Sequence, residues 1–167
     1  PHGIDPNFRR IPDSKLDIPA WLPDDGYFLY VSTLDVYKAQ IEVITAYALL
    51  KKRRNISQKL VLIGSEYKPY GNKVRMAIAD HNLKNDVIIK GAIPHDTLPS
   101  VYQNADVNIF ASETENCPFI LLEAMAAGRP LLVSHCQPMP EFAENSVIYF
   151  SPESPEDLAN KLSVVID

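Results

Sequence analysis

The sequence predicts an α/β domain, a Rossmann-like doubly wound parallel sheet of about six strands with helices on both faces. Short apolar runs rich in β-branched and aromatic residues recur from Tyr27 to Phe150, and segments with helical spacing separate them. Strands that alternate with helices run parallel, and a parallel sheet covered on both faces needs strands that are apolar throughout. This alternation predicts the fold class before any motif is considered.

Length and composition are those of one ordinary globular domain. The chain has 167 residues, 46% of them hydrophobic and 22% charged, and a chain of this length buries roughly two-thirds of its unfolded surface. A net charge of −5 without a basic block or an aromatic platform argues against nucleic acid as a partner. No apolar run approaches the length of a membrane span. The histidines and cysteines show no ligand spacing, so we expect no metal site.

The first 26 residues are interpreted as a linker. They are rich in Pro and Asp and lack periodicity, so we expect an interdomain segment on the surface. The chain also opens at Pro1 without an initiator Met, like the interior of a longer polypeptide. We therefore expect an excised domain that spans residues 27–167.

Each element follows from its local pattern. Apolar runs predict strands at residues 27–33, 60–63, 87–89, Val107–Phe110, Leu131–Ser134 and residues 147–150. Helical spacing predicts helices at residues 38–54, 72–81, 97–104, 118–127 and 155–164. Asp96 and Ser154 are the expected N-caps of the third and last helices, and Gly128 is the expected C′ residue of the fourth.

The junction around Pro118 is the most informative stretch. Glu115 and Glu123 stand on either side of it, and Pro118 suits the first position of a helix. The N–H groups from Phe119 onward would then be free donors at the positive end of a helix dipole, a site for phosphate. The junction thus offers one anion site with a carboxylate on each side. A nucleotide sugar fits it, because such a ligand joins a diphosphate to hydroxyl-rich groups at both ends.

Three candidate groups follow the ends of predicted strands. Lys38 follows the first strand, the loop after Gly91 follows the third, and Glu115 follows the fourth. In an open α/β sheet, ligands bind outside the carboxyl ends of the strands. These groups can therefore share one crevice.

Taken in chain order, the motifs resemble the C-terminal, donor-binding domain of a family 4 (group 1) retaining glycosyltransferase with the two-domain GT-B fold. The signature is two glutamates with seven residues between them, continued by Glu123-Ala124-Met125-Ala126 and Gly128-x-Pro130. Further agreement covers nearly the whole chain, at Tyr30-Val31, Lys38, Leu62-Ile63-Gly64, Gly91, Tyr102-x-x-Ala105-Asp106, Pro140-Glu141 and Pro155-Glu156-Asp157-Leu158-Ala159. The resemblance implies one half of a GT-B enzyme, whose N-terminal acceptor domain is missing here.

The resemblance also implies a role for each matching residue. Glu115 would contact hydroxyls of the transferred sugar and Lys38 would neutralise the diphosphate leaving group, so both are expected to be catalytic. Glu123 would bind the nucleotide ribose, and the backbone of the loop Gly91 to Pro94, around Ile93, would recognise the base. The helix start would bind the distal phosphate through backbone N–H groups, and its residues are Cys117, Pro118, Phe119 and Ile120. Thr33, at the end of the first strand, completes the expected donor-binding residues.

Two departures from the family pattern affect the diphosphate. Many members end the first strand with Gly-Arg, where this chain has Ser32-Thr33. A hydroxyl supplies no charge, so stabilisation would depend on Lys38, on the helix terminus or on a basic residue from elsewhere. The glycines that often follow the first glutamate are replaced by Asn116-Cys117-Pro118, whose side chains crowd the approach.

The expected function is retaining transfer of a hexosyl group from a nucleotide sugar, with the isolated domain inactive alone. We expect no cofactor and no metal, because Lys38 and the helix dipole take over the charge-stabilising role. The acceptor would be a glycan, a lipid-linked glycan or a small molecule, held by the N-terminal domain of the same polypeptide. We expect a cytoplasmic protein, with peripheral contact at the inner membrane face through the missing half as an option.

Two alternatives stay open. A non-catalytic nucleotide-sugar-binding or assembly module would keep the site without turnover, and the absent arginine favours it. Another Rossmann-like nucleotide-binding domain is the second alternative. A dinucleotide-dependent oxidoreductase is disfavoured because residues 31–37, the first strand-to-helix turn, contain no glycine. A receiver-like signalling domain leaves the paired glutamates unexplained.

Overall fold

A sheet of six parallel strands forms the centre of the computed structural model, which describes residues 4–9 and 18–167. The strand order is β3-β2-β1-β4-β5-β6, and every neighbouring pair is parallel. The strands are β1 (Tyr27–Val31), β2 (Lys59–Ile63), β3 (Val87–Gly91), β4 (Val107–Phe110), β5 (Leu131–Ser134) and β6 (Ile148–Phe150). The doubly wound fold that the sequence predicts is confirmed.

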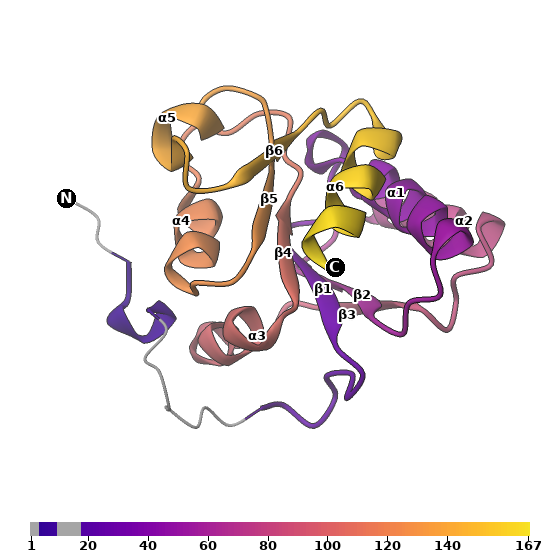
Figure 1. The fold of residues 1–167 in the computed structure, drawn as a ribbon. Coiled ribbons are helices and arrows are strands. Elements are labelled where there is room, and N and C mark those ends of the chain that lie inside the picture. Colours follow the sequence, from indigo (N-terminus) through magenta and orange to yellow (C-terminus); the bar gives the residue numbers. More distant parts are fainter. Residues whose placement is uncertain (1–3, 10–17) are drawn as a thin grey trace.

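Helices cover both faces of the sheet (Figure 1). On one face lie α1 (Gln40–Arg53), α2 (Lys68–Asp80) and α6 (Pro155–Val165). On the other lie α3 (Leu98–Asn104), α4 (Phe119–Ala126) and α5 (Met139–Ala143). Because both faces are covered, the two central strands, β1 and β4, are buried at every residue. No helix in the described part of the chain is both long enough and apolar enough to cross a membrane.

The connection from β1 to α1 differs from the prediction. β1 ends at Val31, and Lys38 closes a 3₁₀ helix (η2, Val36–Lys38) instead of starting the long helix. Ala39 follows in the left-handed conformation, with φ 52° and ψ 34°, and α1 begins at Gln40. A single residue in this conformation turns the chain sharply, and the helical period of a sequence does not reveal such a turn.

Two of the three predicted caps are confirmed. Ser154 Oγ accepts the N–H of Asp157 at 3.2 Å, and Gly128 follows α4 with a φ of +64°. The prediction for Asp96 is wrong, because Asp96 lies inside a second 3₁₀ helix (η3, His95–Thr97) that precedes α3. Thr97 occupies the N-cap position of α3 without a side-chain cap bond.

One predicted helix begins well before its predicted start, and one helix was not predicted. α2 begins at Lys68, before the predicted residue 72. The short α5 was not predicted, because its five residues are too few to show a helical period.

The segment before β1 does not lie wholly on the surface, contrary to the interpretation of residues 1–26. A 3₁₀ helix (η1, Pro6–Phe8) packs against α3 and α4, and the side chain of Phe8 is fully buried. Leu22 is also buried. Two aromatic or aliphatic side chains are enough to anchor a Pro-rich segment to the core when a site for them exists. Residues 1–3 and 10–17 of the predicted linker lie outside the described residues.

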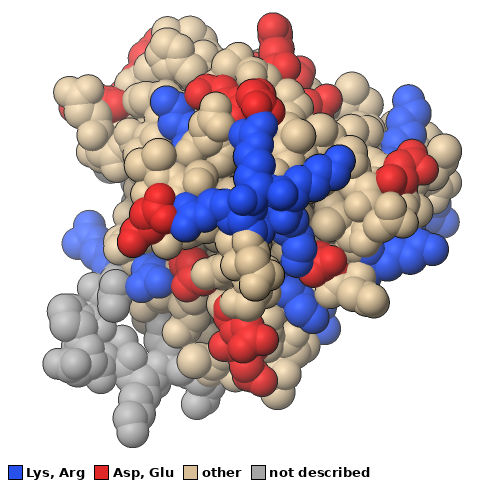
Figure 2. Space-filling model, turned by 45° about the vertical axis from the view of Figure 1, so that its right-hand side comes forward, with Lys and Arg blue, Asp and Glu red and all other residues tan. Residues whose placement is uncertain are grey.

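Arg53 and Arg54, at the end of α1, contact α6 and the residues after it, and Figure 2 shows blue and red side chains gathered on this face. Arg53 donates to Asn160 at 2.9 Å and forms an ion pair with Glu156. Arg54 donates to the Ser163 carbonyl at 2.8 Å and pairs with Asp167. These contacts attach the last helix to the first, and such exposed ion pairs each stabilise a fold by only about 0–1 kcal/mol.

Candidate functional site

The candidate site lies where β1 and β4 are neighbours, at their carboxyl ends. From β1 the chain continues to β2 on one side, and from β4 it continues to β5 on the other. This reversal of strand order opens a crevice in doubly wound sheets, because the two connections leave in opposite directions. The loops that carry Lys38 and Glu115 leave the sheet at this point.

The backbone around Lys38 is held by two side chains. The Asp35 carboxylate accepts the N–H of Val36 at 2.7 Å, which starts η2, and the Tyr30 hydroxyl donates to the Lys38 carbonyl at 2.7 Å. Burial raises the pKa of Tyr30 far above its ordinary value, so this hydroxyl remains a donor. Ala39 adopts its left-handed conformation immediately after, at a cost of about 1–3 kcal/mol. The surrounding contacts therefore fix the backbone of Lys38, and the strained residue beside it is Ala39.

The loop that carries Glu115 is attached to the same 3₁₀ helix. Glu113 N–H donates to the Tyr37 carbonyl at 2.8 Å. Ser112 Oγ donates to the Thr114 carbonyl at 3.0 Å, and Ser134 Oγ donates to the Ser112 carbonyl. The ends of β4 and β5 thus fix the loop from both sides.

Lys38 and Glu115 form an ion pair through Nζ and Oε1. Their side chains are only 8% and 16% exposed, so water screens the pair weakly. Lys38 Nζ also lies 4.7 Å from the centroid of the Tyr37 ring, within reach of a cation–π contact. The structure therefore brings together the two residues expected to be catalytic.

The start of α4 differs from the predicted anion site. Pro118 occupies the N-cap position and not the first helical position, and α4 begins at Phe119. Phe119 N–H is not a free donor, because it donates to the Cys117 carbonyl at 2.9 Å. The first backbone N–H groups of an α-helix have no partner within the helix, and Pro118 has no N–H at all. The open donors at the N-terminus of α4 are therefore the N–H groups of Ile120 and Leu121. The predicted phosphate site, formed by backbone N–H groups from Cys117 to Ile120, therefore loses the donor expected at Phe119. It gains the N–H of Leu121.

Glu123 lies further along α4 and contacts a residue that the sequence did not single out. Its Oε1 is 3.0 Å from His95 Nε2. The Glu123 side chain is 15% exposed and that of His95 is 62% exposed. His95 directly follows the loop expected to recognise the base. This position was the one feature of the sequence that could have marked His95 as a residue of the site. The structure thus brings the end of that loop to Glu123.

The ends of β1, β2 and β3 stay close together. Gly64 N–H donates to the Gly91 carbonyl at 3.0 Å. Gly64 has a φ of +149°, and a Cβ there would lie 2.2 Å from the Ser32 carbonyl oxygen, so only glycine fits. Thr33 is exposed, with its hydroxyl 3.3 Å from that of Ser65, and Ile93 packs partly against the core. Thr33 itself brings no charge to this end of β1.

A cavity of about 500 Å³ lies beside this site, at the carboxyl ends of β5 and β6. His135, Cys136, Tyr149 and Glu153 are among its lining residues. Burial, and then the charges of Glu113 and Glu153, raise the pKa of the Cys136 thiol, which makes it a poor nucleophile. Within residues 4–9 and 18–167, no group of three or more His, Cys, Asp or Glu side chains converges as metal ligands do.

Sequence comparison identifies relatives among glycosyltransferases. An uncharacterized glycosyltransferase of Methanocaldococcus jannaschii is 30% identical over 139 residues, which are 81% of this chain and 34% of the relative. The O-antigen chain mannosyltransferase B of Escherichia coli is 27% identical over 134 residues, 80% of this chain and 34% of that protein. The chain spans about a third of the length of these curated relatives.

Solved structures share the fold at low sequence identity. Anabaena HepE, crystallised with UDP and glucose, has a TM-score of 0.77 at 21% identity, over 86% of this chain and 39% of HepE. The C-terminal domain of a group 1 family glycosyl transferase from Francisella tularensis has a TM-score of 0.71 at 21% identity, over 87% of this chain and 77% of that domain. The model of the family described as glycosyl transferases group 1 matches residues 14–167. Its match to nearly the whole chain, joined with the fold, shows that this protein belongs to the group 1 glycosyl transferases.

Proposed function

We propose that the chain is the donor-binding, C-terminal domain of a retaining glycosyltransferase of family 4 with the GT-B fold, which transfers a hexosyl group from a nucleoside diphosphate sugar. The observation that carries the proposal is the Lys38–Glu115 pair at the β1/β4 crevice. Support comes from neighbours of the same fold that were crystallised with UDP and with UDP-glucose. A mannosyltransferase among the relatives supports the hexosyl group.

In the proposed reaction, negative charge grows on the departing diphosphate while the sugar gains oxocarbenium character. Lys38 would exchange Glu115 for a phosphate oxygen, and the open N–H groups of Ile120 and Leu121 would bind the distal phosphate. Both act as preorganised electrostatic groups, because the buried Tyr30–Lys38 hydrogen bond fixes η2 and the helical backbone of α4 fixes its N–H groups before the donor arrives.

The two glutamates would bind the two ends of the donor. Glu115, released from Lys38, would contact hydroxyls of the sugar beside the reacting carbon. Glu123 would accept hydrogen bonds from the ribose, next to the loop Gly91–Pro94 that would face the base. The acceptor would come from an N-terminal domain of the same polypeptide, in the cytoplasm or at the inner face of a membrane.

The test is a panel of UDP-, GDP-, ADP- and dTDP-sugars added to the 167-residue chain, with binding detected by ligand-observed NMR. We expect one nucleotide to bind preferentially, with or without EDTA, because Lys38 supplies the fixed cation. Binding by none of them would contradict the proposal. Loss of binding in EDTA would instead show that a metal ion holds the diphosphate.

A second experiment separates the enzyme from a non-catalytic binding module. The alternative of a non-catalytic module rests on Thr33, which provides no charge where many family members have arginine. A full-length protein that binds the donor but transfers sugar to no acceptor would favour the module. The 167-residue chain itself should bind the donor without transferring the sugar, since it would lack the acceptor site.

A further inference from the structure

His95 connects three parts of the fold. Its Nε2 lies 3.0 Å from Glu123 Oε1 on α4, and its ring centroid lies 5.2 Å from that of Phe8 on η1. His95 itself belongs to η3, which follows β3. The loop after β3 is therefore attached to the proposed ribose-binding residue on one side and to the N-terminal segment on the other.

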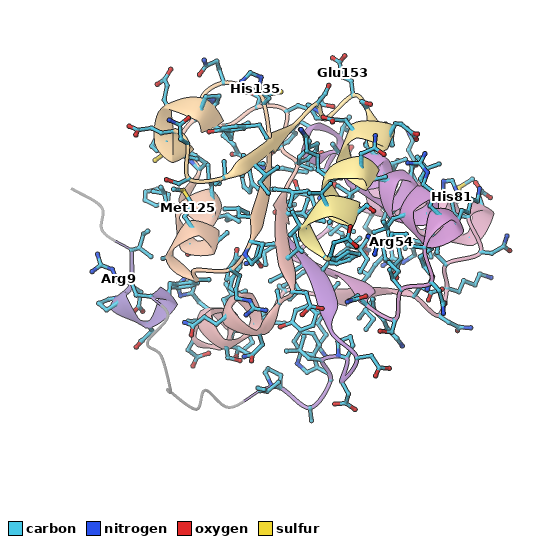
Figure 3. The ribbon with its side chains drawn as sticks, in the orientation of Figure 1. Arg9, Arg54, His81, Met125, His135 and Glu153 are labelled. Atoms are coloured by element: carbon cyan, nitrogen blue, oxygen red, sulfur yellow. The ribbon has the colours of Figure 1, made fainter. Side chains whose placement is uncertain are left out.

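The Phe8 side of this contact is firmly held. The Phe8 ring is fully buried and lies 5.9 Å from the ring of Tyr102 on α3. Gln103, also on α3, donates from Nε2 to the carbonyls of Asn7 and Phe8 at 3.0 and 3.3 Å. In Figure 3, Arg9, the next residue of this segment, lies on the same side of the molecule as Met125 of α4. η1 therefore gives the imidazole a fixed surface to pack on.

The Glu123 side of the contact leaves room for a ligand. A carboxylate has two oxygens with about four acceptor positions, and His95 uses one of them on Oε1. The remaining positions can accept both hydroxyls of a ribose. The charge of Glu123 also reaches the core, since it adds to burial in raising the pKa of Tyr102 well above its ordinary value. His95 thus restricts the rotation of Glu123 without occupying the carboxylate.

We propose that His95 is a positioning residue for the nucleotide site: packed on Phe8, it holds the Glu123 carboxylate in the orientation that accepts the two ribose hydroxyls. The inference rests on the proposed function, in which Glu123 binds the ribose. It extends that function, because it makes η1, a segment that precedes the sheet, a structural support of nucleotide binding.

The test uses two nucleotides that differ only at the ribose. Wild-type chain is titrated calorimetrically with UDP, GDP and ADP, and then with the 2′,3′-dideoxy form of whichever binds most tightly. His95→Ala should weaken the normal nucleotide about three- to tenfold, the effect of one lost hydrogen bond. The dideoxy nucleotide should bind the variant and the wild type equally, because it offers Glu123 no hydroxyls.

Three further variants make the result specific. His95→Gln keeps an N–H donor near the position of Nε2 and should restore most of the affinity. Phe8→Leu keeps an apolar side chain in the core but removes the ring, and should reproduce the ribose-dependent loss to a smaller degree. His81→Ala is the matched control, because His81 directly follows α2, on the opposite side of the molecule from Arg9 and Met125 in Figure 3, and it should leave nucleotide affinity unchanged. Thermal unfolding of each variant checks that the fold is intact.

The outcomes separate this inference from the proposed function. A wild-type chain that binds none of the three nucleotides overturns both. A ribose-dependent loss in Glu123→Gln, together with wild-type affinity in His95→Ala, overturns the inference and leaves the function standing. Equal losses of both nucleotides in His95→Ala also overturn it, since they would report general damage to the loop. Wild-type behaviour of Phe8→Leu beside a defective His95→Ala would remove η1 from the proposal.

Discussion

Lys38 and Glu115 form a largely buried ion pair although they lie 77 positions apart in the chain. Lys38 lies on η2 and Glu115 on the loop after β4, and the two segments are joined by the hydrogen bond that Glu113 N–H donates to the Tyr37 carbonyl. In the proposed function, the incoming diphosphate would replace Glu115 as the partner of Lys38. The ion pair would then hold the cation in place before the donor binds and release the Glu115 carboxylate afterwards.

Lys38→Ala in the full-length enzyme should lower kcat by about 10²-fold or more, the usual effect of removing one preorganised electrostatic group. Donor affinity should fall much less, because leaving-group charge is greatest in the transition state. Steady-state kinetics and calorimetric titration give the two quantities. Lys73→Ala, an exposed lysine on α2, is the control and should match the wild type. Unchanged turnover in Lys38→Ala would show that the phosphates are stabilised by other groups.

Glu123→Gln should weaken binding of the nucleoside diphosphate by about 1.5–3 kcal/mol, the range for hydrogen bonds to a charged group. The measurement is calorimetric titration of the 167-residue chain with its preferred nucleoside diphosphate. Glu156→Gln, an exposed glutamate on α6, is the control and should bind as tightly as the wild type.

Glu115→Gln should give the opposite pattern to Glu123→Gln. Nucleoside diphosphate affinity should stay equal or increase, because Lys38 loses its competing partner, while transfer by the full-length enzyme should fall. A large loss of nucleoside diphosphate affinity in Glu115→Gln would exchange the roles of the two glutamates. Wild-type behaviour of both variants would mean that the pair is structural.

Gly64→Ala should destabilise the domain by about 2–5 kcal/mol, the sum of backbone strain and overpacking. The new Cβ would lie 2.2 Å from a backbone oxygen, which cannot move without shifting β1. Gly91→Ala is the matched comparison, because its φ is +77° but no atom lies within 4 Å of the added carbon. It should lose only about 1–2 kcal/mol, the cost of a left-handed residue. Urea unfolding gives both values, and equal losses would show that the contact at Gly64 is relieved.

Stability should decrease in alkaline solution because the buried tyrosines resist ionisation. Burial raises the pKa of Tyr70 to about 12, and it raises the pKa values of Tyr27, Tyr30 and Tyr47 further. Above the ordinary value of about 10, the unfolded chain loses protons that the folded chain keeps, so the free energy of unfolding falls as pH rises. The contribution of Tyr70 is complete below pH 10 and declines between about pH 10 and 12. Urea unfolding across this range tests it, and a flat profile would contradict the burial of these hydroxyls.

The sequence by itself determined the fold class, the six strands in chain order, every α-helix except α5, and the strand ends from which the site residues follow. These features depend on local apolar runs and on periodicity, which neighbouring residues specify together. Ser154 and Gly128 were predictable for the same reason, since caps act within a single turn of the chain. The crevice was predictable because the carboxyl ends of parallel strands meet at one edge.

Only the tertiary structure decided which side chains touch. It pairs Lys38 with Glu115, places His95 against Glu123, buries Phe8 of the supposed surface linker, and occupies the N–H of Phe119 within its own turn. It also places Ala39 in the left-handed conformation, so that Lys38 precedes α1 and lies against the β4 loop. These contacts join segments far apart in sequence or depend on one dihedral angle. Local propensity cannot specify them, because their energies arise only when the sheet has assembled and the loops share one edge.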